Sequence, residues 1–395
     1  MTSQTSATAA TSAPSITSVP FIDLKRFEEG FLERWEERVR DITLNTRFVG
    51  GPDVAALEAR LAEQAGVAGG VVGCANGTDA IQLALRASGV GEGDIVLIPD
   101  ATFWATFEAV VNVGARPVTV DVDPDDLQMD YGLFAQAVET YKPRAVILVH
   151  LYGWASARLD DFRSFCRERD LPLIEDGAQS WGTTWKGASI YAGAYMSSVS
   201  FYPAKVLGAC GDAGAVLCST PELAETVRML GNHGRTSHYG HGLVGWNSRM
   251  SGFDAAWLDL SLDYLDERLE SRRRGADYYA DRLASATAAD GSAVRIIRAP
   301  FGYAENGYLN VIQVDPQLRP RLESALQKES IGYGNVYPGS MSEQPGADTH
   351  LVAAVGGDVA ARLGQGVLNL PLFAHIREEE LERVVQVVEA ALRGA

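Results

Sequence analysis

The segment MSSVSFYPAKVLG, residues 196–208, places a lysine directly after a short run of small and apolar residues. The run has the length and composition of a buried strand, and Lys205 stands in the turn beyond it. The glycine-rich segment GDAGAV, residues 211–216, follows closely. A lysine buried beside other cations loses its proton more easily, and the free amine can form a Schiff base with a carbonyl compound. An exposed turn lysine is the commoner case, so the neighbouring segments decide between the two interpretations.

Upstream of this lysine, short apolar segments alternate with helical ones. We expect strands over residues 70–74, 94–99, 117–122, 145–150, 171–175 and 196–201, and helices over residues 78–87, 102–113, 131–140 and 159–169. Continuous apolar strands that alternate with helices are typical of a buried, mostly parallel sheet, which indicates an α/β fold. Ligands bind beyond the carboxyl ends of such strands. We therefore expect the functional site in the loops after Cys74, Pro99, His150 and Glu175.

The remainder of the chain indicates a second, smaller unit. We expect helices over residues 27–44 and 53–64 before the alternating region. After it we expect a long helix over residues 252–283, strands over 294–298 and 309–314, and helices over 320–329 and 378–392. We therefore predict a large domain over residues 19–245, with the sheet flanked by helices, and a smaller α+β domain over residues 246–395. Residues 1–18 are rich in Ser, Thr and Ala, and we predict a disordered tail there.

The composition argues against several classes of protein. The 395 residues include 46% hydrophobic ones, as in an ordinary globular protein. The net charge of −17 and the scattered basic residues argue against a nucleic-acid partner. No apolar run is long enough to cross a membrane. The four cysteines form no CxxC pair, so we predict no metal site and no disulfide framework, and we expect a cytoplasmic protein.

Two of the loops offer groups that suit a flat, anionic ligand. Gly77 and Thr78 stand at the expected start of a helix, where unpaired N–H groups and a hydroxyl can hold a phosphate. A plain helix cap by Asn76 or Thr78 is the simpler interpretation of the same residues. Phe103 follows the next strand and could stack on a heterocycle, although core packing is the commoner use of an aromatic ring.

A third loop adds an acid, and the set then describes one cofactor. Asp176 ends an apolar strand, where burial is costly unless the carboxylate meets a cation such as a protonated ring nitrogen. A helix cap is an equally good interpretation of Asp176 alone. Gln179 could reach a ring hydroxyl. An anion cradle, a stacking ring, a buried acid and the downstream Lys205 together predict pyridoxal phosphate, which binds a lysine through its aldehyde.

The same motifs resemble those of the DegT/DnrJ/StrS aminotransferases. The matching runs are NGTDA at 76–80, EDGAQ at 175–179, SFYPAK at 200–205 and GDAG at 211–214, with further agreement at 47–52, 232–234 and 245–249. The resemblance extends from Val19 to the C-terminus. These aminotransferases are fold-type-I pyridoxal phosphate enzymes of the aspartate aminotransferase superfamily, and most act on nucleotide-linked keto sugars.

The resemblance implies a role for each matching residue. Lys205 would be the catalytic lysine that binds the cofactor and moves the proton, and Asp176 would pair with the ring nitrogen. The other implied cofactor contacts are Gly77, Thr78, Phe103, Gln179, Ser200 and, from a neighbouring subunit, Asn247. A contact of that kind implies a homodimer with shared active sites. Lysine at position 205 disfavours the branch of the family that dehydrates sugars, because histidine stands there in those relatives.

The resemblance also bears on the substrates. The runs FYP at 201–203 and GACGD at 208–212 favour a dTDP-3-keto-6-deoxyhexose over a 4-keto sugar as the acceptor, with L-glutamate as the amino donor and amino-sugar or antibiotic biosynthesis as the setting. Trp181 stands where many 3-keto enzymes have histidine, and Tyr337 lacks the histidine that often follows its Tyr-Pro pair. We expect both side chains to contact the acceptor. A keto-cyclitol acceptor stays open, and so does a non-catalytic regulator that binds the cofactor, although Lys205, Asp176 and Gln179 argue against the regulator.

Overall fold

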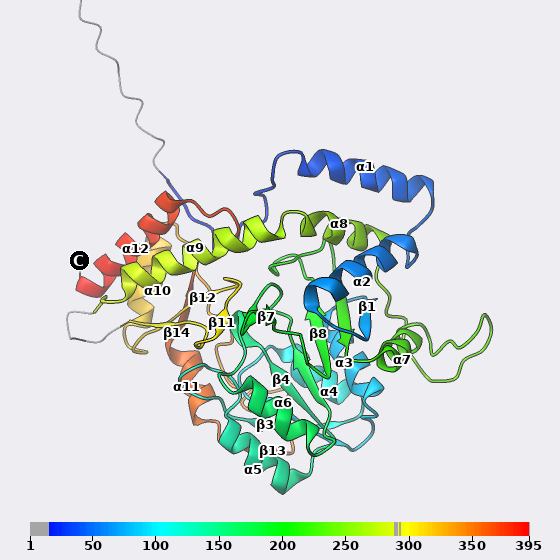
Figure 1. Cartoon of the computed structure of the whole chain (residues 1–395). Coiled ribbons are helices and arrows are strands. Elements are labelled where there is room, and N and C mark those ends of the chain that lie inside the picture. The colour runs from blue at the N-terminus through cyan, green and yellow to red at the C-terminus, as the bar shows by residue number, and fades with distance from the viewer. Residues whose placement is uncertain (1–15, 288–290, 292–293, 395) are drawn as a thin grey trace, which may run out of the picture.

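A central sheet carries the alternating region, as predicted (Figure 1). The structure is a computed structural model and describes residues 16–287, 291 and 294–394. Within these residues the largest sheet has eight strands in the order β1-β9-β8-β5-β4-β2-β3-β13. The strands are β1 (Gly70–Cys74), β2 (Ile95–Pro99), β3 (Arg116–Val120), β4 (Ala145–Val149), β5 (Leu173–Asp176), β8 (Met196–Ser200), β9 (Gly214–Cys218) and β13 (Ala353–Val355). Only β9 runs antiparallel to its neighbours, so the sheet is mostly parallel and the predicted fold class is confirmed.

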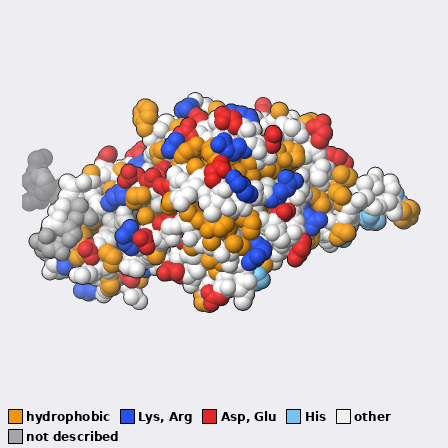
Figure 2. Space-filling model, turned by 90° about the horizontal axis from the view of Figure 1, so that it is seen from below, with side chains coloured by type: hydrophobic (Ala, Val, Ile, Leu, Met, Phe, Trp, Pro, Cys, Tyr) orange, Lys and Arg blue, Asp and Glu red, His pale blue; other side chains and the backbone are white. Residues whose placement is uncertain are grey.

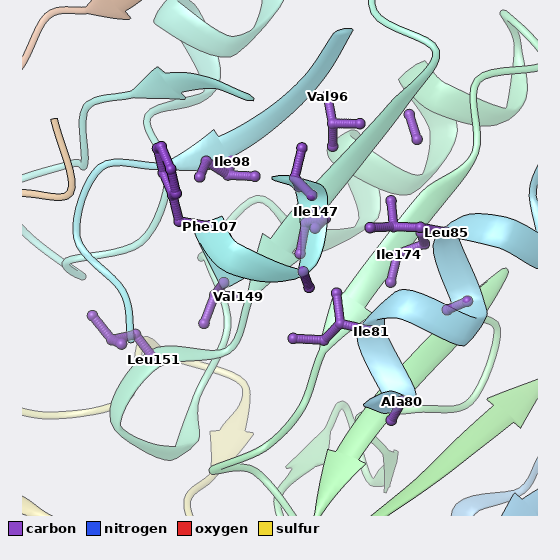
Figure 3. Close-up of a cluster of buried hydrophobic side chains, with 14 of the residues drawn as sticks. Ala80, Ile81, Leu85, Val96, Ile98, Phe107, Ile147, Val149, Leu151 and Ile174 are labelled. Atoms are coloured by element: carbon purple, nitrogen blue, oxygen red, sulfur yellow. The ribbon is translucent and has the colours of Figure 1, made fainter. Parts of the chain in front are cut away.

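Helices cover both faces of this sheet. Successive strand residues point to opposite faces, and because both sets are apolar, both faces must be buried. The helices that flank it are α2 (Pro52–Ala65), α3 (Gly77–Ala87), α4 (Trp104–Asn112), α5 (Tyr131–Tyr141), α6 (Leu159–Arg167), α7 (Pro221–Gly231) and α8 (Gly252–Leu262). On one face Ile98 and Ile147 pack against Ile81 and Phe107 (Figure 3). On the other face, Leu97, Val146 and Leu148 belong to the core that includes Leu57, Phe134 and Phe162. The continuous apolar strands in the sequence are thus explained by burial on both sides.

A smaller unit packs beside the sheet. It contains a three-stranded sheet of β10 (Arg295–Ile297), β12 (Asn310–Gln313) and β14 (Val367–Leu370), together with α10 (Arg319–Lys328), α11 (Asp358–Gly366) and α12 (Glu378–Arg393). The helix α9 (Leu265–Leu283) connects this unit to α8 (Figure 1). The expected single helix over 252–283 is therefore two helices, with a break at Asp263 and Tyr264. The expected strands and helices of this unit agree with the structure to within about two residues, as is usual for element ends.

Two segments pair across the predicted boundary at residue 245. Val19 pairs with Ile331, so the N-terminal arm before α1 (Phe31–Leu44) joins the smaller unit. The strand β13 comes from the C-terminal part and pairs in parallel with β3 at the edge of the large sheet. Such segments are held at the edge of a sheet by hydrogen bonds between backbone groups. Because almost every residue has these groups, the amino-acid composition does not reveal which segment will pair. Residues 1–15 of the predicted tail lie outside the described residues.

The structure also contains elements that the pattern did not predict. These include β9, α7, α11, β13, β14 and a small sheet of β6 (Thr184–Trp185), β7 (Ala188–Ser189) and β11 (Tyr303–Ala304). The start of α7 was readable, because Thr220 caps it and Pro221 occupies its first turn. No helix in the described ranges combines the length and the apolar character needed to cross a membrane. On the face seen from below, acidic, basic and apolar side chains are mixed (Figure 2).

Candidate active site

A single cavity of about 830 Å³ lies beyond the carboxyl ends of five strands, β1, β2, β4, β5 and β8. This is the edge of the sheet where the alternating pattern predicted a ligand. Eight of the ten predicted site residues line it, and these are Gly77, Thr78, Phe103, Asp176, Gln179, Ser200, Lys205 and Tyr337. Residues from four separate loops and from the smaller unit thus meet in one place.

The start of α3 forms one wall of the cavity. Asn76 caps this helix, because its side-chain oxygen accepts a hydrogen bond of 2.8 Å from the N–H of Asp79. The N–H groups of the first turn have no partner within a helix, so those of Gly77 and Thr78 remain available. A β-carbon at Gly77 would lie 2.6 Å from the β-carbon of Ser200, so a larger residue there would have to displace Ser200 or the helix start. The cap and the anion cradle are therefore compatible interpretations of one motif.

Asp176 is the buried acid of the cavity, with only 5% of its surface exposed. One carboxylate oxygen accepts a hydrogen bond of 3.1 Å from the Thr106 hydroxyl, and the other accepts one of 3.1 Å from the N–H of Ala178. Both donors are neutral. Burial raises the pKa of Asp176, and the hydrogen bonds from Ala178 and Thr106 oppose this only in part. A cation at this position, such as a protonated ring nitrogen, would stabilise the ionised carboxylate.

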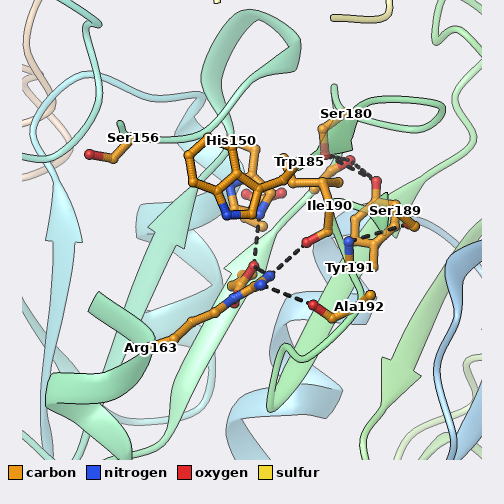
Figure 4. A network of polar contacts seen from close by, with 12 residues as sticks. His150, Ser156, Arg163, Ser180, Trp185, Ser189, Ile190, Tyr191 and Ala192 are labelled. Carbon is orange, nitrogen blue, oxygen red and sulfur yellow. Dashed lines mark hydrogen bonds and ion pairs between the residues drawn. The ribbon is translucent and has the colours of Figure 1, made fainter. Parts of the chain in front are cut away.

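The preceding acid, Glu175, belongs to a different network, whose members His150 and Arg163 are labelled in Figure 4. Its side chain is fully buried and accepts hydrogen bonds of 2.7 and 2.8 Å from the guanidinium of Arg163. The imidazole of His150 lies 2.9 Å from the same carboxylate. Burial by itself would raise the pKa of Glu175, but the charge of Arg163 and the hydrogen bonds from His150 and Arg163 lower it to about 2. We did not predict this network, although an acid inside an apolar strand already required a cationic partner.

Lys205 points into the cavity from the turn after β8. Its amine lies 3.3 Å from the hydroxyl of Tyr308, a residue that was not among the ten predicted site residues. The carbonyl of Tyr202 accepts a hydrogen bond of 2.8 Å from the backbone N–H of Lys205 and thereby tightens the turn. Among the described residues no carboxylate forms an ion pair with this amine. The amine is therefore available for a reaction inside the cavity.

Three further predicted residues, Gln179, Tyr337 and Phe103, also line the cavity. The side-chain oxygen of Gln179 accepts a hydrogen bond of 2.6 Å from the N–H of Tyr152, and its nitrogen donates to the hydroxyl of Tyr337. The ring of Phe103 is 61% exposed at the mouth, with its centre 6.4 Å from that of Tyr337. An aromatic ring this exposed contributes little to the core, which favours the stacking role predicted for Phe103.

Two predicted residues lie outside the cavity. The ring of Trp181 is buried in the core, 5.5 Å from the ring of Tyr191 and 6.0 Å from that of Phe201. The expectation that Trp181 lines the acceptor side must therefore be corrected, because the loop after β5 turns this side chain inward. Asn247 is exposed and accepts a hydrogen bond of 2.7 Å from Arg249. Its contact with a neighbouring subunit stays a prediction.

The residues of the cavity fit pyridoxal phosphate. The glycine-lined helix start suits the phosphate, and the buried Asp176 carboxylate, whose hydrogen-bond donors are neutral, suits the ring nitrogen. The Lys205 amine, which is hydrogen-bonded only to a neutral hydroxyl among the described residues, suits the aldehyde. The cavity is also large enough for the cofactor together with a substrate, since pockets of about 300–1,000 Å³ hold drug-sized ligands. The fit rests on features that are independent of one another.

Comparison with known proteins agrees with this fit. The sequence profile of the DegT/DnrJ/EryC1/StrS aminotransferase family matches residues 32–389. The UDP-N-acetyl-3-dehydro-alpha-D-glucosamine 3-aminotransferase of Acidithiobacillus ferrooxidans is 36% identical over 96% of this chain and 99% of its own. The dTDP-3-amino-3,4,6-trideoxy-alpha-D-glucose transaminase of Streptomyces venezuelae is 33% identical over 94% of this chain and 95% of its own. The crystal structure of DesV from S. venezuelae superimposes with a TM-score of 0.89 at 32% identity and covers 96% of this chain and 100% of DesV.

Proposed function

The chain belongs to the DegT/DnrJ/EryC1/StrS aminotransferase family, and on that premise we propose that it transfers the amino group of L-glutamate to the keto carbon of a nucleotide-linked sugar. It is a sugar aminotransferase that depends on pyridoxal phosphate. The identities of the donor and the acceptor are the proposal. The observation that carries it is the placement of the Lys205 amine and the Asp176 carboxylate on one cavity at the carboxyl ends of the strands.

Each group of cavity residues would have its own role in the reaction. Bound pyridoxal phosphate supplies an aldehyde that takes up an amine and a ring that accepts electrons. The first-turn N–H groups of α3 and the Ser200 hydroxyl would hold the phosphate. Asp176, kept in place by Thr106 and Ala178, would hold a proton on the ring nitrogen through its negative charge. The Lys205 amine would bind the aldehyde, leave it when the donor arrives, and then carry a proton between the donor carbon and the cofactor.

We place the acceptor among nucleotide-linked 3-keto sugars. The names of the A. ferrooxidans and S. venezuelae relatives both place the amino group on carbon 3, of a UDP-sugar and of a dTDP-sugar respectively. Among such sugars a dTDP-3-keto-6-deoxyhexose is favoured by the sequence motifs, in a pathway to an amino sugar or an antibiotic. A 4-keto sugar and a keto-cyclitol are the competing acceptors.

The visible spectrum of the purified holoenzyme tests the donor half of this proposal. Wild type should absorb in the visible range and lose that band on addition of L-glutamate, whereas Lys205→Ala should show neither property. Amination should then be assayed with UDP- and dTDP-linked 3-keto and 4-keto sugars and with a keto-cyclitol. Exclusive amination of a 4-keto sugar or of the cyclitol would overturn the proposed acceptor.

We further propose a homodimer in which Asn247 completes the neighbouring active site. In the single chain the rings of Phe103 and Tyr202 are 61% and 54% exposed, although both line the cavity. Phe48 and Val49 are also exposed, at 45% and 56%. Burial of such apolar surface by a second copy would stabilise the assembly. All four cysteines are unpaired, in keeping with a reducing cytoplasm as the place of action.

A further inference from the structure

Tyr308 contacts the reacting lysine and has no role in the function described so far. It stands just before β12, in the smaller unit, and its half-buried side chain lines the cavity. Its hydroxyl lies 3.3 Å from the Lys205 amine, and the centre of its ring lies 5.1 Å from the same nitrogen. Within the described ranges this is the one side-chain hydrogen bond recorded for that amine.

A buried clamp determines the position of Tyr308. The amide nitrogen of Asn306, which is fully buried, donates hydrogen bonds of 2.8 and 2.9 Å to the backbone carbonyls of Gln179 and Trp181. The amide oxygen of Asn306 accepts one of 2.9 Å from the N–H of Tyr308. The segment that carries Tyr308 is therefore tied to the loop that follows Asp176, although the two are more than a hundred residues apart in sequence.

Gly307, which lies between Asn306 and Tyr308, also shows that this segment is tightly held. Gly307 has a φ of +64°, and a β-carbon there would lie 2.7 Å from the β-carbon of Arg272. The neighbouring Arg273 donates hydrogen bonds of 2.7 Å to the carbonyl of Glu305 and 3.0 Å to that of Gly182. Such a segment holds a side chain more firmly than a free loop would, which is what a contact with a reacting atom needs.

We propose that Tyr308 is a catalytic residue whose hydroxyl orients the Lys205 amine while that amine is detached from the cofactor. The amine takes one proton from the donor carbon and becomes an ammonium group. One N–H of this ammonium then donates a hydrogen bond to the Tyr308 oxygen, which leaves another N–H directed at the carbon that receives the proton. Delivery of that proton restores the neutral amine, so no proton is gained or lost.

The inference rests on the pyridoxal phosphate reaction and is independent of which sugar is the acceptor. Without the hydroxyl, the four-carbon side chain of Lys205 can adopt several rotamers in a cavity of about 830 Å³. A small displacement of a reacting group slows its step about 10²-fold. Tyr308→Phe keeps the ring and removes only the oxygen.

The test compares Tyr308→Phe with Tyr303→Phe in the holoenzyme. Tyr303 is a matched control, because its hydroxyl donates a hydrogen bond of 2.9 Å to the Ser156 carbonyl, outside the cavity. The loss of the visible band on rapid mixing with glutamate should slow about 10²-fold in Tyr308→Phe and stay unchanged in the control. Glutamate deuterated at the α-carbon should show a larger isotope effect in Tyr308→Phe than in wild type, which a merely structural role would not produce. Tyr308→His, which restores a polar atom, should recover part of the rate.

A second readout needs no cofactor. A crystal structure of apo wild type should show the Lys205 amine directed at residue 308, and that of apo Tyr308→Phe should show it in several rotamers. An unchanged rate and isotope effect in Tyr308→Phe, or a single unchanged rotamer, would overturn the inference. If the wild type reacts with glutamate but aminates no nucleotide sugar, the proposed acceptor fails and the role of Tyr308 stands.

Discussion

At the scale of single residues, two adjacent acids show how the partner decides the role. Glu175 and Asp176 end the same buried strand, and their side chains point to opposite faces of the sheet. The pKa of Glu175 is lowered to about 2, because Arg163 and His150 outweigh the effect of burial. The pKa of Asp176 is raised, because burial outweighs the hydrogen bonds from Ala178 and Thr106 and the charges of Lys205 and His150. Glu175 therefore stabilises the fold through its ion pair with Arg163. Asp176, whose hydrogen-bond donors are neutral, suits the binding of a cationic ligand group.

Glu175→Gln tests the first of these roles. The substitution leaves the buried Arg163 guanidinium without its carboxylate, which should lower the free energy of unfolding by about 3–5 kcal/mol at pH 7. Because the folded-state pKa lies below the ordinary value of 4.5, wild type holds this stability above pH 4.5 and loses it as the pH falls towards about 2. Urea unfolding of the apoproteins at several pH values should show that the free energies of unfolding of wild type and Glu175→Gln converge as the pH falls below 4.5. Glu139→Gln, which breaks an exposed pair with Lys142, is the control and should change little.

Trp181→His tests the corrected position of that residue. Because the ring is buried against Tyr191 and Phe201, we expect a loss of stability on the order of 3 kcal/mol, with little change in the ratio of rates for different keto sugars. Thermal unfolding and a comparison of kcat/KM between two acceptors measure the two effects. A changed ratio of kcat/KM between the two acceptors, without loss of thermal stability, would instead indicate that Trp181 contacts the acceptor.

At the scale of elements, the approach of α3 to the end of β8 creates the anion cradle. The helix is capped by Asn76, and its first residue touches the strand so closely that a β-carbon does not fit. A similar contact occurs at Gly214 in β9, where a β-carbon would lie 2.4 Å from the backbone of Asn76. Glycines at these two points allow the free N–H groups of the helix to lie at the edge of the sheet.

Gly77→Ala tests this arrangement. The added methyl must displace Ser200 or the helix start, a strain of about 1–3 kcal/mol that falls on the phosphate contacts. We therefore expect the dissociation constant of the cofactor to rise about tenfold or more. Equilibrium titration of apoprotein with pyridoxal phosphate measures it. Gly91→Ala is the matched control, because a β-carbon there meets nothing within 4 Å, and equal affinity in both variants would contradict the cradle.

At the scale of the whole molecule, the cavity depends on segments from both units. The large sheet supplies Asp176 and Lys205, and the smaller unit supplies Tyr308 and Tyr337. The N-terminal arm and β13 cross between the units through pairings with Ile331 and β3. A change in how the units pack would therefore move Tyr308 and Tyr337 relative to Lys205.

A mixture of two inactive variants tests whether a second subunit also contributes. If Asn247 acts on the neighbouring site, a heterodimer of Lys205→Ala and Asn247→Ala contains one intact site and one doubly altered site. Each variant alone should be impaired, and the isolated heterodimer should recover about half of the wild-type activity. Differently tagged subunits and two-step affinity purification provide that heterodimer. Activity no higher than that of the Asn247→Ala parent would show that Asn247 acts within its own chain or not at all.

The sequence by itself determined the sheet class, the place of the cavity and most of its lining, because these follow from short-range patterns. Alternating apolar strands and helices predict a buried parallel sheet, and the loops after its strands carry Gly77, Asp176 and Lys205. The tertiary structure alone decided which face each neighbouring side chain occupies and what it meets. It turned Trp181 into the core, paired Glu175 with Arg163, and brought Tyr308 to Lys205 across 103 residues. Such contacts depend on the packing of distant segments, and a local pattern carries no information about its distant partner.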